Sequence, residues 1–172
     1  MFRHEKTISQ ALLVALWMIA LAPLARAGLK EGDRLPDLAT FKLEGNLPAE
    51  IKGRIILLDF WASWCAPCKA SFPAMEALRK KYAERGVTII AVSVDEEREK
   101  MEQFLKSFKV DFVILRDAEQ KLVAAFDVPT MPTSFLIDRA GRIRFVHEGF
   151  LGDETIRHYN EEIDQLLKEP LP

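Results

Sequence analysis

The chain has 172 residues, of which 49% are hydrophobic and 29% are charged. This length and composition fit one globular domain with its own core, and no shift in composition along the chain marks a second domain. The formal net charge of −2 at pH 7 gives no basic surface of the kind that binds nucleic acid, so we expect no nucleic-acid partner.

Residues 1–27 have the three-part layout of a secretory signal peptide. Basic residues precede an apolar run of 14 residues, 11–24, and the A-R-A triplet that ends the segment has small residues where a cleavage site needs them. We expect cleavage after Ala27, which leaves one domain over residues 28–172 in the periplasm. The alternative is an uncleaved membrane anchor, but the apolar run is shorter than the roughly 20 residues needed to span a bilayer.

The sequence of the first part of that domain predicts a hairpin, a strand and a helix. Two apolar stretches within residues 38–51, separated by a turn at 44–46, predict an N-terminal hairpin. The run Ile55–Trp61 is almost entirely apolar, as in a strand that is covered on both faces. Apolar residues at helical spacing after Lys69 predict a helix that ends at Gly86, a residue suited to a left-handed cap.

Strands and helices alternate in the rest of the chain. The predicted elements are a strand over residues 87–94, an amphipathic helix within 95–108, a strand over 112–115, a helix over 118–126, a hairpin of strands 133–137 and 142–146, and a final helix capped by Asp153. This order predicts an α/β fold with a mixed central sheet.

The only two cysteines, Cys65 and Cys68, form a C-x-x-C motif at the predicted strand-to-helix junction. No other cysteine is present to pair with either one, so the pair is free for chemistry rather than for structural bridging. Unpaired N–H groups and the helix dipole stabilise a thiolate at a helix N-terminus. We therefore expect Cys65, nearer the open end, to attack, and Cys68, in the first turn, to resolve a mixed disulfide.

The residues around this motif resemble a known family. The segment DFWASWCAPCK at 59–69 resembles the thioredoxin active-site signature, and Pro73 matches the proline that kinks the thioredoxin helix. The segment VPTMPTSFLID at 128–138 is similar to the cis-proline loop and the strand after it. Together with the export segment, the chain resembles the TlpA/ResA/CcmG (DsbE-like) group of extracytoplasmic thioredoxin-like proteins. The resemblance implies a thioredoxin-like sandwich, with helices on both faces of a mixed sheet and an inserted helix and strand.

The resemblance also assigns a role to Asp59, which matches the buried acid behind the thioredoxin cysteines. That acid helps to move the proton of the resolving thiol, and a carboxyl buried among apolar residues has the raised pKa that suits this exchange. The alternative is a strand-end carboxylate in water. Two departures from the family pattern are visible, because Ala91 replaces the lysine partner of the acid and Ser71 replaces a glutamate common in the TlpA/ResA group.

Substrate contacts are implied on both sides of the cysteines. The resemblance makes Met131-Pro132 the cis peptide bond that faces them, and the exposed backbone of Met131 could pair with an extended substrate by strand addition. Trp64 is expected to flank the site, with Ala66 and Pro67 beside it. Pro67 also suits a first helical turn, because it has no N–H to leave unpaired.

The function that these features favour is a periplasmic thiol–disulfide oxidoreductase that reduces disulfides of exported proteins. The Ala66-Pro67 dipeptide is similar to the dipeptides of reducing relatives. By resemblance, the substrates belong to cytochrome c maturation or to copper-site assembly of oxidases, and a membrane thiol reductant of the DsbD/CcdA type supplies the electrons.

Two other functions remain open from the sequence. In an oxidising compartment the same pair could act as a disulfide donor or isomerase. Alternatively, the dithiol could bind Cu(I) as a metallochaperone-like module. We expect neither a cofactor nor a bound metal ion, because a structural zinc site would need two more ligands beside the cysteines.

Overall fold

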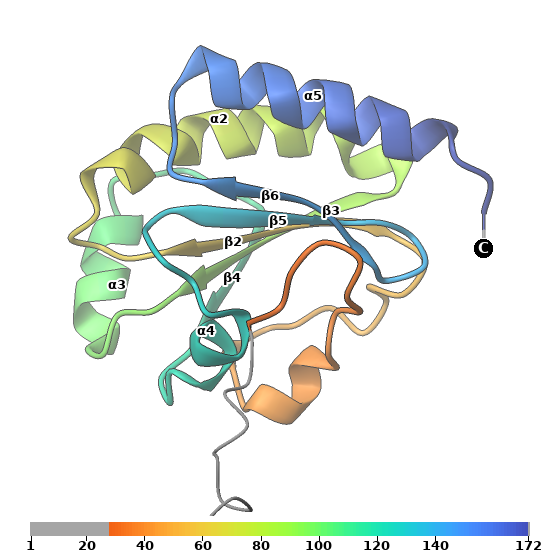
Figure 1. Cartoon of the computed structure of the whole chain (residues 1–172). Coiled ribbons are helices and arrows are strands. Elements are labelled where there is room, and N and C mark those ends of the chain that lie inside the picture. The colour runs from red at the N-terminus through yellow and green to blue at the C-terminus, as the bar shows by residue number, and fades with distance from the viewer. Residues whose placement is uncertain (1–27, 172) are drawn as a thin grey trace, which may run out of the picture.

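The computed structural model describes residues 28–171, so the expected signal peptide lies outside the described residues. Its six strands are β1 (Glu44–Gly45), β2 (Ile55–Trp61), β3 (Val87–Ser93), β4 (Val113–Arg116), β5 (Thr133–Ile137) and β6 (Ile143–Glu148). They form one sheet in the order β1-β4-β3-β2-β5-β6 (Figure 1). The three central strands β4, β3 and β2 are parallel, while β1, β5 and β6 run antiparallel to their neighbours. The predicted mixed sheet is confirmed.

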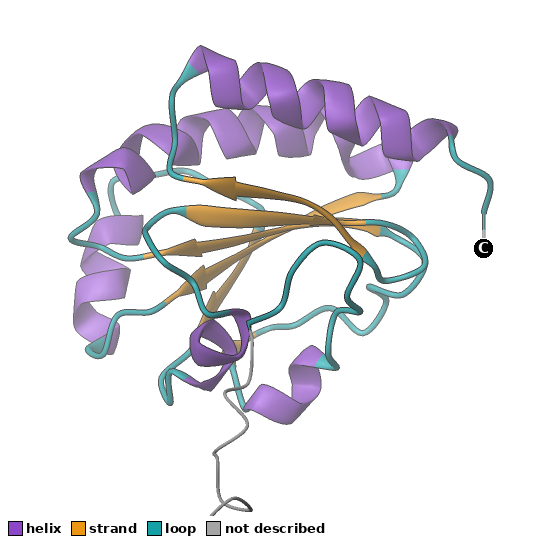
Figure 2. Ribbon diagram, viewed as in Figure 1, coloured by secondary structure: helices purple, strands orange, loops and turns teal. Residues whose placement is uncertain are grey.

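Helices cover both faces of this sheet (Figure 2). They are α2 (Ala66–Tyr82), α3 (Arg98–Leu105), α4 (Lys121–Phe126) and α5 (Asp153–Lys168), with short 3-10 helices η2 (Leu38–Phe41) and η3 (Ala83–Arg85). In Figure 1, α2 and α5 lie side by side above the sheet, whereas α4 and η2 lie below it. The inserted helix and strand that the resemblance implies are present as α3 and β4, between β3 and α4.

Strand β2 is the centre of the core, since all seven of its residues are buried between β3 and β5. Its side chains alternate between the two faces of the sheet. Trp61 packs against Phe72 of α2 with ring centroids 4.8 Å apart, while Phe60 packs against Phe126 of α4 at 5.2 Å. Asp59 is in phase with Trp61, so its carboxyl lies on the face that α2 and α5 cover.

The predicted N-terminal hairpin is wrong. Residues 38–41 form the 3-10 helix η2, whose N-cap Asp37 accepts a hydrogen bond from the backbone N–H of Ala39 at 3.1 Å. Glu44 and its neighbour then pair with β4 rather than with a second N-terminal strand. The carboxylate of Glu44 accepts two hydrogen bonds from Arg116 of β4, at 2.7 and 2.8 Å. The Asp37 cap and the contact with Arg116 therefore determine the path of this segment, which the apolar pattern alone does not predict.

The start of the last helix also differs from the prediction. Gly152 is the N-cap of α5, and Asp153 is its first helical residue. The hydroxyl of Thr155 accepts the backbone N–H of Leu151 at 2.9 Å, so a side chain within the first turn fixes the entry of the chain into the helix. Asp153 still stands at the positive end of the helix dipole, where a carboxylate is favourable.

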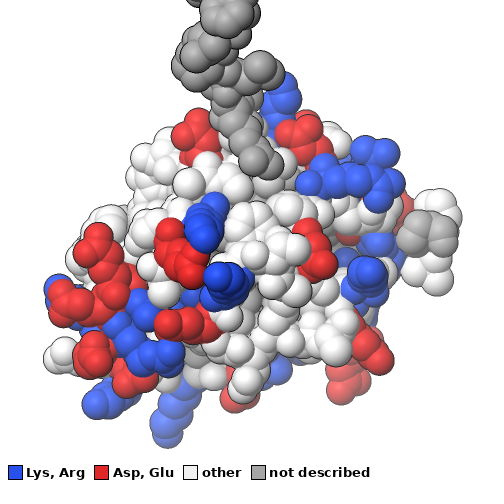
Figure 3. Space-filling view, turned by 90° about the horizontal axis from the view of Figure 1, so that it is seen from below, with Lys and Arg blue, Asp and Glu red and all other residues white. Residues whose placement is uncertain are grey.

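The surface below the sheet carries charges of both signs. Figure 3 shows Lys and Arg side chains next to Asp and Glu side chains on this face, separated by uncharged surface. Within residues 28–171, no helix has the length and apolar character required to cross a membrane.

Candidate functional site

The two cysteines lie where β2 ends and α2 begins. Cys65 is the N-cap of α2, and its sulfur accepts a hydrogen bond from the backbone N–H of Cys68 at 3.1 Å. The two sulfurs are joined in a disulfide. When the pair is reduced, the same N–H and the helix dipole favour negative charge on the sulfur of Cys65. The local geometry thus suits the attacking role that the sequence predicts for this residue.

The disulfide is buried, whereas the residues next to Cys65 in the chain are exposed. Cys65 is only 3% exposed in the disulfide form. Cys68 is fully buried. Trp64 is 71% exposed, and Ala66 and Pro67 are exposed beside it. Three of the five residues that the sequence predicts to contact substrate therefore form the exposed surface on either side of Cys65 in the chain.

Asp95 holds the loop that precedes Cys65. Its buried carboxylate accepts the backbone N–H of Ser63 at 3.0 and 3.2 Å and the hydroxyl of Ser63 at 2.8 Å. Ser93, at the end of β3, donates a further hydrogen bond at 2.8 Å. Sequence reasoning missed this residue. The available signal was its place two residues after a buried strand that runs parallel to β2, because parallel strands end at the same edge of a sheet.

Asp59 lies inside the sheet at 1% exposure. The hydroxyl of Ser134 in β5 donates to its Oδ1 at 2.5 Å, while Oδ2 has no hydrogen-bond partner. Burial raises the pKa of the Asp59 carboxyl to about 7, although the Ser134 hydrogen bond acts in the opposite direction. The alternative of a strand-end carboxylate in water does not hold. Ala91 is the register partner of Asp59 in β3, in agreement with the predicted loss of the lysine.

Two further hydroxyl-bearing residues surround the cysteine and the acid. The phenol oxygen of Tyr159 in α5 lies 2.7 Å from the hydroxyl oxygen of Ser134. On the other side, Ser71 is buried and donates to the carbonyl of Cys68 at 3.0 Å. Ser71 therefore has a hydrogen-bonding role, although it lacks the carboxylate that relatives carry there. The partnership of Ser134 and Tyr159 was not predicted, because nothing in the local sequence links them to Asp59.

The proline loop joins the same end of the sheet. Met131-Pro132 is a cis peptide bond, as predicted, and Pro132 is buried while Met131 is half-buried. Gly149, after β6, donates its N–H to the carbonyl of Pro132 at 2.7 Å. The next residue, Thr133, pairs with Phe60 near the carboxyl end of β2. Because the cysteines follow that end of β2, the loop and the disulfide lie at one edge of the sheet.

Comparison with known proteins agrees with this arrangement. The family model described as Redoxin matches residues 30–163. The chain belongs to the Redoxin family. It is 32% identical over 136 residues to the thiol-disulfide oxidoreductase ResA of Bacillus subtilis (strain 168), covering 78% of this chain and 76% of that protein. ResA of Bacillus thuringiensis (strain Al Hakam) is 34% identical over 143 residues, with 82% and 79% covered.

Solved structures extend the likeness of this Redoxin-family chain to three dimensions. A crystal structure from Chlorobium tepidum, described as a DsbE thiol:disulfide interchange protein, has a TM-score of 0.74 and 34% identity, over 81% of this chain and 99% of the other. The solution structure of a protein from Bacteroides thetaiotaomicron, with a TM-score of 0.70 and 24% identity, shares the fold. The chain is a thiol–disulfide oxidoreductase of the ResA/DsbE type with a thioredoxin-like fold.

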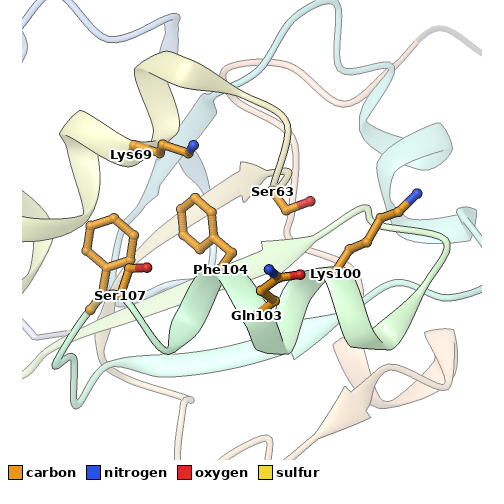
Figure 4. A pocket seen from close by; sticks show the side chains of 7 residues that line it. Ser63, Lys69, Lys100, Gln103, Phe104 and Ser107 are labelled. Carbon is orange, nitrogen blue, oxygen red and sulfur yellow. The ribbon is translucent and has the colours of Figure 1, made fainter.

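The inserted helix of this Redoxin-family enzyme forms one wall of a cavity beside the active-site helix. The cavity has a volume of about 350 Å³ and is lined by Ser63, Lys69, Lys100, Gln103, Phe104, Ser107 and Phe108. In Figure 4, Lys69 reaches in from α2, opposite Gln103 and Lys100 of α3. The ammonium group of Lys100 is 2.7 Å from the carboxylate of Glu97, so its charge is paired. Ser63 links this cavity to the loop that precedes the cysteines.

Within the part of the chain that the structure describes, no group of three or more histidine, cysteine, aspartate or glutamate side chains is arranged to hold a metal ion. His147 instead bonds Glu162 at 2.7 Å and stacks on His158 with ring centroids 6.0 Å apart.

Proposed function

We propose that this oxidoreductase reduces disulfides of exported proteins, with Cys65 as the attacking thiol and Cys68 as the resolving thiol. The observation that carries the proposal is the position of the Cys65 sulfur, which caps α2 and accepts the N–H of Cys68 at 3.1 Å. A thiolate is the nucleophile in thiol–disulfide exchange, and this position favours the thiolate.

The first half of the reaction forms a mixed disulfide. The thiolate of Cys65 attacks one sulfur of the substrate disulfide, forms a bond to it and expels the other substrate sulfur as a thiolate. The exposed surface at Trp64, Ala66 and Pro67 is the region that a substrate segment would contact. On the opposite side, the backbone of Met131 would pair with an extended substrate chain.

The second half releases the substrate. Cys68 loses its thiol proton, and its sulfur attacks that of Cys65. The Cys65–Cys68 disulfide then forms while the bond to the substrate sulfur breaks. Asp59 is the proposed acceptor of the proton, because its buried carboxyl has a pKa of about 7 and can be found in either protonation state near neutral pH. The enzyme ends oxidised by two electrons and the substrate reduced by two.

The setting of this reaction is inferred from the sequence. The signal-peptide layout of residues 1–27 supports export to the periplasm. Resemblance to the TlpA/ResA/CcmG group supports substrates in cytochrome c maturation or oxidase copper-site assembly. The same resemblance supports re-reduction by a membrane thiol reductant of the DsbD/CcdA type. These assignments come from family likeness rather than from the geometry of the site.

A trapping experiment tests the roles of the two cysteines. Cys68→Ser should accumulate a mixed disulfide with a substrate protein or a model disulfide peptide, detected by non-reducing gel and mass spectrometry, because the resolving sulfur is gone. Cys65→Ser, its matched control, should form no such adduct. An adduct on Cys68 in the Cys65→Ser variant, with none in Cys68→Ser, would reverse the two roles.

The direction of electron flow is tested by the redox equilibrium with glutathione. A reduction potential near that of thioredoxin, about −270 mV, agrees with a reductant. A potential near about −120 mV, typical of a strong oxidant, would reject the reductase and favour a disulfide donor. Tight binding of Cu(I) to the reduced protein, without disulfide exchange, would favour the metallochaperone-like alternative instead.

A further inference from the structure

A line of hydroxyl groups runs from the buried carboxyl of Asp59 to the C-terminal helix. Ser134 donates to Oδ1 of Asp59 at 2.5 Å, and its oxygen lies 2.7 Å from that of Tyr159. All three side chains are buried. A serine hydroxyl has a single proton. Since Ser134 gives that proton to Asp59, the contact with Tyr159 requires the phenol to be the donor. Both hydrogen bonds therefore point toward the carboxyl.

We propose that Ser134 and Tyr159 are positioning residues, which hold Oδ1 of Asp59 through ordered donors and leave Oδ2 free to exchange a proton with the Cys68 thiol. This inference rests on the proposed role of Cys68 as the resolving thiol. The pair takes the role that the thioredoxin lysine would have, but from β5 and α5, since Ala91 faces Asp59 from β3.

The two oxygens of the Asp59 carboxyl have different surroundings, and only Oδ2 is open to proton exchange. Oδ1 keeps its hydrogen bond from Ser134 in either protonation state, because the carbonyl oxygen of a carboxylic acid is still an acceptor. Oδ2 is buried without a partner, so the proton is carried there without disturbing the network. Burial, followed by the nearby Asp59 carboxyl, raises the pKa of the Tyr159 phenol, and the phenol stays protonated as a donor across the working pH range.

The proton of the Cys68 thiol passes through Asp59 during the release step. Cys68 gives its thiol proton to the Asp59 carboxylate, and the sulfur then forms its bond to Cys65 as the bond between Cys65 and the substrate breaks. The departing substrate thiolate takes up a proton, which the Asp59 carboxyl returns. Asp59 is thus a carboxylate before and after the step, and the hydroxyls of Ser134 and Tyr159 keep their own protons.

Other titratable and polar groups face this network from each packed element, and the test must separate their titration from that of Asp59. They are the disulfide-bonded Cys65 and Cys68 at the start of α2, His147 of β6 and Glu162 of α5, while β3 contributes the apolar Ala91. The imidazole of His147 packs edge-on against the Tyr159 ring, with centroids 5.0 Å apart. In the oxidised protein the cysteines do not titrate. A probe of the carboxyl carbon of Asp59 therefore reports the protonation of that carboxyl alone.

The experiment is a ¹³C-carboxyl NMR titration of oxidised protein carrying labelled aspartate, with Asp59→Asn identifying the resonance. The wild type should titrate near pH 7. Ser134→Ala removes a hydrogen bond to the charged form, so its midpoint should rise by about one pH unit. Tyr159→Phe keeps the ring and removes only the donor to Ser134, so its midpoint should rise by less.

Tyr82→Phe is the matched control. Tyr82 is a second buried tyrosine, and its hydroxyl bonds Asn160 at 2.9 Å rather than the Asp59 network. Its removal should leave the midpoint unchanged. The same order of midpoints is expected in the pH profile of substrate release, measured as the single-turnover decay of a mixed disulfide between Cys65 and a chromogenic thiol.

Either readout can overturn the inference. Midpoints of Ser134→Ala and Tyr159→Phe that match the wild type would reject the positioning role, and if Ser134→Ala does not fold, Tyr159→Phe alone decides. Shifted NMR midpoints with an unshifted release profile would also reject it, because the network would then not act on Cys68. Failure of the proposed function looks different, since the wild type would then form no mixed disulfide at any pH.

Discussion

Two buried carboxylates, one in β2 and one just after β3, differ in how many hydrogen bonds they accept. Asp95 is 2% exposed and accepts hydrogen bonds from the backbone N–H and hydroxyl of Ser63 and from the hydroxyl of Ser93. Asp59 is 1% exposed and accepts one hydrogen bond, while its Oδ2 is buried without a hydrogen-bond partner. Burial is nearly equal in the two cases. The number of donors is what separates a carboxylate that fastens a loop from one suited to exchanging a proton.

The largest expected effect comes from removing the well-bonded carboxylate. Asp95→Ala leaves three donors on Ser63 and Ser93 without their acceptor, and we expect a loss of about 5 kcal/mol in the free energy of unfolding. Denaturant unfolding monitored by tryptophan fluorescence measures this loss. Asp95→Asn, which retains one acceptor oxygen, is the matched control and should lose less. A loss below about 1 kcal/mol in Asp95→Ala would show that the loop is fastened by other contacts.

Removal of the poorly bonded carboxyl should have a different effect, visible in its pH dependence. The pKa of Asp59 is raised from 3.8 in the unfolded chain to about 7, so the neutral form stabilises the fold below pH 4 and this stabilisation is lost as pH rises through 7. The expected decrease in the free energy of unfolding is at most about 4 kcal/mol. Asp59→Asn should remove this component, so that the variant gains stability relative to the wild type at pH 8 but not at pH 4.

Parallel stability curves for Asp59→Asn and the wild type between pH 4 and pH 8 would contradict this expectation. Asp37→Asn is a suitable control, because Asp37 is also an aspartate with a hydrogen bond from the backbone but lies near the surface at the cap of η2. Its variant should follow the pH dependence of the wild type closely.

The smallest effect concerns a single donor to Asp95. Ser63→Ala removes the hydroxyl that bonds Asp95 at 2.8 Å but keeps the backbone N–H in place, so we expect a loss of about 1 kcal/mol. Ser107 is an exposed serine that lines the cavity beside α2 together with Ser63. Ser107→Ala should change the free energy of unfolding by less than about 0.5 kcal/mol. Equal losses in the two variants would mean that the Ser63 hydroxyl adds nothing to the fastening of the loop.

Most of what the sequence predicts correctly depends on short spacing along the chain. The C-x-x-C motif, the buried run at 55–61 and the helix after Lys69 are each visible within a few residues, and all are present in the structure. The burial of Asp59 also follows locally, because its neighbours in β2 are apolar. Such features depend on alternation within one strand or one helix.

The features that escaped prediction depend on distant contacts. The predicted N-terminal hairpin failed because Glu44 pairs with Arg116, 72 residues away. Ser134 lies 75 residues after Asp59, and no pattern in β5 reveals which side chain its hydroxyl meets. Asp95 is 32 residues from the serine that it holds. A single sequence shows that these residues are polar but not which partners the sheet order brings to them.

The separation of the contacting residues along the chain sets the order in which the parts of the site form during folding. Cys65 and Cys68 are three residues apart and can close their disulfide as soon as the first turn of α2 forms. The Asp59 network instead closes loops of 75 and then 25 residues, and such non-local closure is slow because its entropy is lost before the contacts form. A chain that has not yet docked its last helix therefore has the cysteine pair in place without the completed Asp59 network. We therefore expect full turnover only from the molecule whose C-terminal helix is in place.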